Sequence, residues 1–316
     1  MPTQLRISSR ALIVALCKFS GFLCAGDASG QDDTTLHRAK VSIDYVSKES
    51  LGGGVTVAKL NSGLTVIVRE NHAAPVATVR SYVRNTGSAY EGPNVLGAGL
   101  SHVLEHLVSG GTNRKRKEAE IRAIIDSMGG RTNAYTSNDI TGYYIDCPAS
   151  RVNEAIELVA DSMQHVLFDN EEYARELGVV QRELEMGEAD RDRVMYNSMK
   201  KLVYTKHPTR HPTIGYLQVL QGVSRQDIVD FYKERYIPQN IIFVVVGDVE
   251  TDKVLAEVRE NFKFFKRGID ATPVLEEEPE QASPRTTRIE MPGPTTKFSI
   301  AWPTAVAIWS CSGRCS

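Results

Sequence analysis

Residues 99–107 read Gly-Leu-Ser-His-Val-Leu-Glu-His-Leu, and the five residues from His102 to His106 decide how the chain is interpreted. At about 100° per residue on a helix, His106 is turned about 40° from His102 and Glu105 about 60° the other way. The three side chains therefore share one flank of a predicted helix. Two imidazoles four residues apart can bind one Zn²⁺, and the carboxylate between them is placed to take a proton from an attacking water.

The same pentapeptide has a simpler interpretation. Two histidines spaced by four residues on the surface of a helix, with a nearby carboxylate, also form an ordinary helix-stabilising pair. A metal site therefore needs a third ligand, because a catalytic zinc is held by three protein ligands and keeps one open position.

A long helical pattern over residues 170–204 offers acidic candidates for that third ligand. Glu176 and Glu183 are seven residues apart, so their bearings on a helix differ by about 20° and both can face the histidine helix. Glu185 and Glu188 turn elsewhere on the same pattern. Spacing alone leaves both Glu176 and Glu183 open as the ligand.

The remaining patterns predict clustered strands and helices. Strands are expected at 63–69, 76–83 and 241–246, and a hairpin at 131–135 and 141–147. Helices are expected at 97–109, 117–128, 224–235 and 251–262, with another helix capped by Ser150. Because these elements do not alternate strictly, we expect an α+β fold with a mixed or antiparallel sheet packed against helices.

Composition shifts predict five segments along the chain. They are a signal peptide at 1–30, a linker at 31–51, an amino-terminal lobe at 52–270, a second linker at 271–285, and an incomplete second lobe with an irregular tail at 286–316. Residues 297–302 are expected to form the first strand of that second lobe. Since one strand cannot build a lobe, we expect low activity from the chain alone.

The amino terminus favours export. Arg6 and Arg10 precede an apolar run at 11–17, and small residues follow at 25–30, which is the layout of a secretory signal peptide. The first 26 residues also lack acidic side chains, as mitochondrial presequences do. We therefore predict a periplasmic or secreted protein, with a mitochondrial location as the alternative.

Charge and composition exclude some functions. The net charge is −2, so no overall positive field favours nucleic acid. No apolar run reaches the roughly 18 residues of a membrane-spanning helix, so the mature chain is not expected to cross a bilayer. Cys147, Cys311 and Cys315 are too few for a disulfide framework once the predicted signal is removed.

Over about residues 55–300 the chain resembles the pitrilysin/insulinase family of inverted-motif zinc peptidases, which includes the mitochondrial processing peptidases. The residues that carry the resemblance are 99–107, 110–112, 133–137, 182–184, 236–240 and 246–248, in the family's order. The resemblance implies a processing-peptidase-like lobe in which His102, His106 and Glu183 bind zinc. It also implies that Glu105 is the general base and that Glu176 is a supporting glutamate.

The same resemblance places Asn133 and Ala134 on a strand beside the metal site, where a substrate peptide is expected to add as an extra strand. The alternative for Asn133 is a polar residue near a strand end. For the whole chain the resemblance implies a zinc endopeptidase with one Zn²⁺ per chain, acting on peptides or small unfolded proteins.

A rival function is a noncatalytic zinc- and peptide-binding subunit. In the family, an Arg and a Tyr from a second lobe help to stabilise the transition state, and this chain barely enters that lobe. A second peptidase-family chain, or another copy of this one, is therefore an expected partner.

Overall fold

The computed structural model describes residues 44–293 and 295–301. The predicted signal peptide, most of the first linker and the tail from residue 302 lie outside these residues. The described strands are β1 (Tyr45–Gly52), β2 (Val55–Leu60), β3 (Thr65–Glu70), β4 (Val76–Arg84), β5 (Arg131–Thr136), β6 (Ile140–Pro148) and β7 (Ile241–Gly247).

The α-helices lie mostly between β4 and β7 in the sequence. They are α1 (Leu100–Val108), α2 (Glu118–Ser127), α3 (Val152–Gln164), α4 (Asn170–Ala189), α5 (Arg191–Val203), α6 (Leu217–Leu220), α7 (Arg225–Arg235) and α8 (Thr251–Asn261). Short 3₁₀ turns occur at η1 (Ser88–Tyr90), η2 (Ala149–Arg151), η3 (Pro208–Arg210) and η4 (Pro238–Asn240).

The strands form one sheet in the order β1-β2-β3-β7-β4-β6-β5. β7 pairs in parallel with β3 and antiparallel with β4, while the other neighbours are antiparallel. The apolar run of β7 alternates between buried and half-buried residues, as expected of a central strand. The predicted α+β fold with a mixed sheet is confirmed.

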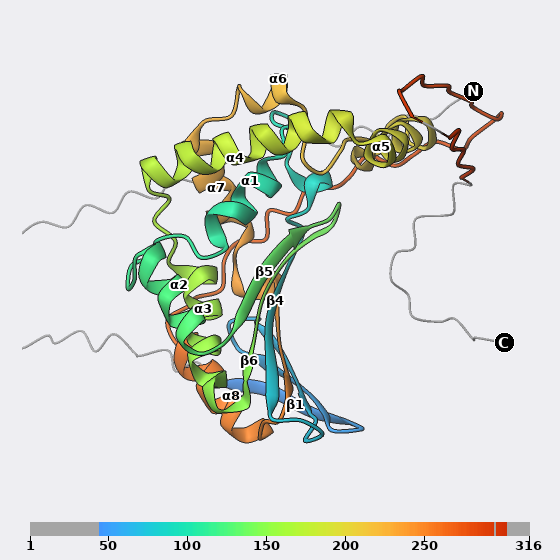
Figure 1. Ribbon diagram of the computed structural model, residues 1–316. Helices are drawn as coiled ribbons and strands as arrows, with labels where there is room; N and C mark the ends of the chain where they lie inside the picture. The colour runs from blue at the N-terminus through green and yellow to red at the C-terminus, as the bar shows by residue number, and fades with distance from the viewer. Residues whose placement is uncertain (1–43, 294, 302–316) are drawn as a thin grey trace, which may run out of the picture. The chain divides into compact units, whose positions relative to one another are not determined.

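Helices cover one face of this sheet. α3 contacts β4, β6 and α8, and α8 contacts β3, while α1 and α2 contact β5. Figure 1 shows α2, α3 and α8 together on one side of the strands, and α4 crossing above α1. Since β5 ends the sheet, the packing of α1 against β5 and α4 brings the histidine motif to a sheet edge.

The predicted helix over residues 170–204 is wrong as a single element. Asp190 has an extended backbone that separates α4 from α5, and its side chain accepts hydrogen bonds from the backbone N–H groups of Asp192 and Arg193. An aspartate in this position is a favoured N-cap, so capping a new helix competes with continuing the old one.

Three further expectations differ from the structure. The sheet begins earlier than residue 52, because exposed β1 starts at Tyr45 and pairs with β2. Ser150 lies in η2 and does not cap α3, whose N-cap is Arg151. Residues 295–301 contain no strand, as expected of a segment without a neighbouring strand to pair with.

Candidate metal and catalytic site

Helix α1 presents the motif because its other face is apolar. Leu100, Val103, Leu104 and Leu107 are at most 2% exposed and pack in the core. Burial of that face turns His102, Glu105 and His106 toward a cavity of about 390 Å³, which all three line. The sequence pattern thus determines which flank of the helix is available for chemistry.

The amino-terminal end of α1 is held by Glu91, which precedes the helix in a separate turn. Its carboxylate accepts hydrogen bonds from the backbone N–H of Gly99 at 3.2 Å and of Ser101 at 3.0 Å. Gly99 has φ +72°, and a Cβ there would collide with the carbonyl of Ile214. Burial raises the pKa of Glu91 to about 8, against the lowering effect of these N–H donors.

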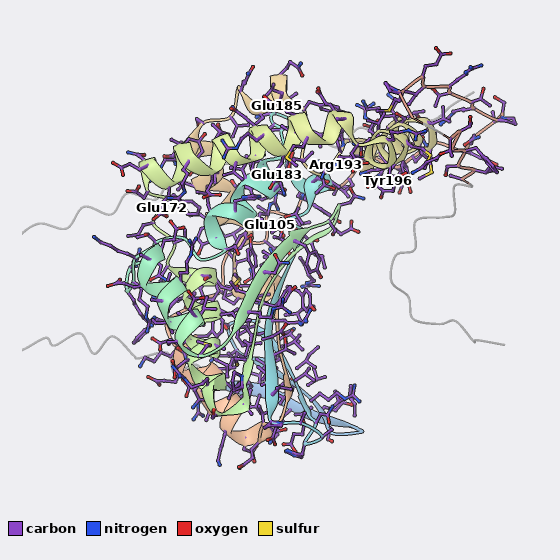
Figure 2. All side chains as sticks on the ribbon, viewed as in Figure 1. Glu105, Glu172, Glu183, Glu185, Arg193 and Tyr196 are labelled. Atoms are coloured by element: carbon purple, nitrogen blue, oxygen red, sulfur yellow. The ribbon has the colours of Figure 1, made fainter. Side chains whose placement is uncertain are left out.

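Helix α4 brings the third candidate ligand to the two imidazoles. Oε2 of Glu183 lies 3.7 Å from Nε2 of His102 and 3.8 Å from Nε2 of His106. Among the described residues, these three form a group whose ligand atoms all lie within 4.8 Å of one another. Figure 2 shows Glu183 on the side of α4 toward Glu105, and Glu185 on the opposite side.

These separations fit a tetrahedral metal ion. Two ligand atoms bound to zinc at about 2.0–2.1 Å lie about 3.3–3.5 Å apart at the tetrahedral angle. The N···O distances at Glu183 are slightly longer than this and too long for direct hydrogen bonds. Two imidazoles and one carboxylate also match the donor set of a catalytic zinc centre. The distances between the three side chains therefore fit binding of a shared cation better than direct hydrogen bonds between them.

The other nitrogen of His106 has a partner of its own. Nδ1 of His106 lies 3.2 Å from Oε2 of Glu176, and Arg175 donates at 3.0 Å from Nε to Oε1 of the same glutamate. Arg175 also donates to Glu118 of α2 at 2.6 Å. This chain of contacts fixes the ring of His106 with Nε2 facing Glu183.

The environment of His102 favours its neutral form, which is the form that binds metal. Burial and, to a smaller extent, the charges of His106 and Arg193 together lower the pKa of His102 to about 4. Arg193 of α5 donates at 3.1 Å to the backbone carbonyl of Glu183, which places its charge beside the site, as Figure 2 shows.

Glu105 is 8% exposed, and one of its oxygens is engaged by a neighbour. The hydroxyl of Thr136, the last residue of β5, donates to Oε2 of Glu105 at 2.6 Å. Burial raises the pKa of Glu105, while the Thr136 hydrogen bond and the His106 charge lower it. The carboxyl therefore lies at the boundary between the core and the cavity.

Every residue that the sequence analysis predicts as a ligand, base, supporting or substrate-binding residue lies around this one cavity. Its lining includes Asn133 and Ala134 from β5, together with Glu176 and Glu183 from α4. Sequence reasoning missed Glu172, which lies one turn before Glu176 and binds the backbone N–H of Thr112 at 3.0 Å. The helical spacing of Glu172 and Glu176 was the available signal.

Two family profiles match this chain. A profile of the insulinase family, peptidase family M16, matches residues 65–216, and a profile of the M16 inactive domain matches residues 222–307. Because β7 at 241–247 lies inside the same sheet as β2 to β6, the second match begins within the described fold.

Individual relatives give the same result. The probable beta subunit of the mitochondrial processing peptidase of Arabidopsis thaliana is 30% identical over 65% of this chain and 38% of its own length. An uncharacterized zinc protease of Bacillus subtilis is 28% identical over 72% of this chain and 54% of its own. This chain thus spans about half the length, or less, of these curated relatives.

A solved structure extends the likeness to three dimensions. A protease from Helicobacter pylori superposes with a TM-score of 0.66 at 29% identity, covering 71% of this chain and 54% of that one. The two family profiles, the curated relatives and the solved structure all indicate the same family, and the superposition shows the shared fold. This chain therefore belongs to the M16 insulinase family of peptidases.

Proposed function

We propose that this chain is the zinc-binding lobe of a metalloendopeptidase that hydrolyses peptides or small unfolded proteins. The observation that carries the proposal is the convergence of His102, His106 and Glu183 on one position, with Glu105 beside it on the same cavity. The names of several relatives, which are called zinc proteases, support zinc as the metal.

The contacts support a role for each residue. His102, His106 and Glu183 hold one Zn²⁺ per chain, and Glu176 orients His106 through its Nδ1. Zinc, when bound, lowers the pKa of a water and polarises the scissile carbonyl. Glu105 takes the proton of the attacking water and returns it to the leaving amine.

The substrate is proposed to bind as an extended strand. Among the described strands β5 pairs with β6 alone and ends the sheet, which leaves its other edge for a peptide, and Asn133 and Ala134 line the cavity there. Pairing through the main chain tolerates many side chains, which suits a peptidase that acts on unfolded segments.

A partner chain is part of this proposal. The Arabidopsis relative is named as a beta subunit, and this chain spans 38% of its length. We propose that a second peptidase-family chain, or another copy of this chain, completes the wall opposite β5. The rival function, a noncatalytic zinc- and peptide-binding subunit, leaves no use for a buried base at Glu105.

The location is proposed as periplasmic or secreted on the strength of the amino-terminal pattern. The mitochondrial alternative is favoured by the Arabidopsis relative, whose name places it in mitochondria. Among residues 44–293 and 295–301, no helix has the length and hydropathy that a bilayer crossing requires.

Hydrolysis of an internally quenched fluorogenic peptide tests the proposal. The full chain is assayed alone and with an added carboxyl-terminal half of the Helicobacter pylori protease, with and without a zinc chelator. Chelator-sensitive cleavage in either mixture supports an endopeptidase. Peptide binding without cleavage in both mixtures, at full zinc content, would instead support the noncatalytic rival.

A further inference from the structure

Thr136 is the only described residue whose side chain donates a hydrogen bond to the carboxylate of Glu105. The O···O distance of 2.6 Å is that of a charge-assisted bond between a hydroxyl and a carboxylate. Because Oε2 of Glu105 is engaged in this way, the second oxygen is the one left to accept a proton from water.

Thr136 stands on the strand that is proposed to bind the peptide. It lies two residues after Ala134, so both side chains project from the same face of β5, and their partners on β6 are Thr141 and Tyr143. Tyr143 is 5% exposed, so this face looks toward the core and α1. One strand therefore carries the peptide-binding edge and the contact to Glu105.

The hydrogen bond between Thr136 and Glu105 should affect the rate of hydrolysis because it sets the position of the general base. A general base must lie within about 2.6–3.2 Å of the proton it removes, and a misplacement of about 1 Å can cost about 100-fold in rate. Among the described residues, no arginine or lysine lies within 4.0 Å of the Glu105 carboxylate, so no ion pair holds it in place of the Thr136 hydrogen bond. Loss of the hydroxyl leaves the carboxylate free to rotate.

Resting on the proposed function, we propose that Thr136 is a positioning residue that holds Glu105 in its working orientation. Thr136 itself contacts neither the metal position nor the scissile bond in this account. Its effect passes through Glu105, so it changes turnover and leaves metal binding and peptide affinity intact.

The test compares Thr136→Val, which keeps the shape and removes the hydroxyl, with Thr136→Ser, which restores the hydroxyl. Thr132→Val is the matched control, because Thr132 lies on the same face of β5 and donates instead to the backbone carbonyl of Tyr144 at 3.1 Å. Each variant of the full chain is assayed for kcat, KM and bound zinc under the conditions in which the wild type cleaves peptide.

We expect kcat to fall about 10- to 100-fold in Thr136→Val, with KM and zinc content unchanged. The kcat of Thr136→Ser should stay within about threefold of the wild-type value, and the kcat of Thr132→Val should equal the wild-type value. Equal losses in the Val and Ser variants, or an unchanged kcat in Thr136→Val, would overturn the inference while leaving the peptidase proposal intact. A wild type that binds zinc but never cleaves peptide would overturn the peptidase proposal itself.

A second measurement does not depend on activity. Thermal unfolding of the metal-free chain is compared for Thr136→Val, Glu105→Ala and the double variant. Because the two side chains share one hydrogen bond, the shifts in Tm should be non-additive, with the double variant close to Glu105→Ala. Additive shifts would show that the two groups do not interact and would also overturn the inference.

Discussion

Nδ1 of His106 lies 3.2 Å from Oε2 of Glu176, while Nε2 of the same ring faces Glu183. A carboxylate at Nδ1 favours the tautomer with a proton there, so the lone pair of Nε2 points to the shared ligand position. Glu176 therefore acts through His106 in this account, without contributing a ligand atom.

Glu176→Gln should weaken zinc binding without abolishing it. Loss of such a supporting carboxylate typically costs about 10- to 100-fold in metal affinity. Competition with a chromophoric chelator measures the effect, and Glu185→Gln is the control, because Glu185 lies on the opposite side of α4. Unchanged affinity in Glu176→Gln would show that the contact with His106 does not orient the ring for metal binding.

Glu105→Gln should keep its zinc and lose turnover. The side chain is the proposed base and supplies no ligand atom, and removing a general base typically costs about 10²- to 10⁴-fold in rate. Zinc content and peptide hydrolysis are measured on the same preparation. Loss of zinc together with activity would require Glu105 to be reassigned as a ligand or as a structural anchor.

Asn133→Ala should weaken peptide binding with little effect on kcat. Asn133 lines the cavity from the edge strand β5, and under the proposed strand addition it would contact the peptide and not the reacting atoms. We expect KM to rise about threefold to tenfold, equivalent to the loss of about one hydrogen bond. Asn261→Ala, whose amide contacts Glu257 within α8, is the control. A fall in kcat at constant KM would contradict a binding role.

The sequence alone predicted which side chains of one helix lie together, but it could not assign the roles of Glu176 and Glu183. The spacing of His102, Glu105 and His106 predicted a shared flank because three residues on one helix obey a fixed geometry. Glu176 and Glu183 share a bearing for the same reason, so spacing could not separate the supporting residue from the ligand. Their assignment came from resemblance.

Contacts between distant segments could not be read from the sequence. Thr136 meets Glu105 only because β5 ends beside α1, and Glu91 meets Gly99 through a buried turn. The helix break at Asp190 was missed because acidic residues suit both a helix surface and an N-cap. Local propensity cannot decide between these two outcomes.

Glu91 should make the stability of the metal-free chain depend on pH. Its pKa is raised from 4.5 to about 8 by burial, so between these values the folded chain holds a proton that the unfolded chain has lost. The free energy of unfolding should therefore fall as pH rises from about 5 to about 8. Glu91→Gln cannot titrate and should flatten this dependence.

Urea unfolding at several pH values between 5 and 8 measures the difference between the two proteins. Glu49→Gln is the control, because Glu49 is exposed on β1. A wild type that becomes more stable than Glu91→Gln as pH rises would show that the N–H donors of Gly99 and Ser101 outweigh burial and keep the carboxylate ionised.

The zinc content of the purified full chain shows whether His102, His106 and Glu183 bind one metal ion. After dialysis against metal-free buffer, mass spectrometry of the metal should find about one zinc per chain in the wild type and in Glu185→Gln. Glu183→Gln and His102→Ala should each have lost most of it, because each lacks one of three protein ligands. Zinc retained undiminished in both variants, or absent from the wild type, would rule out this three-ligand site.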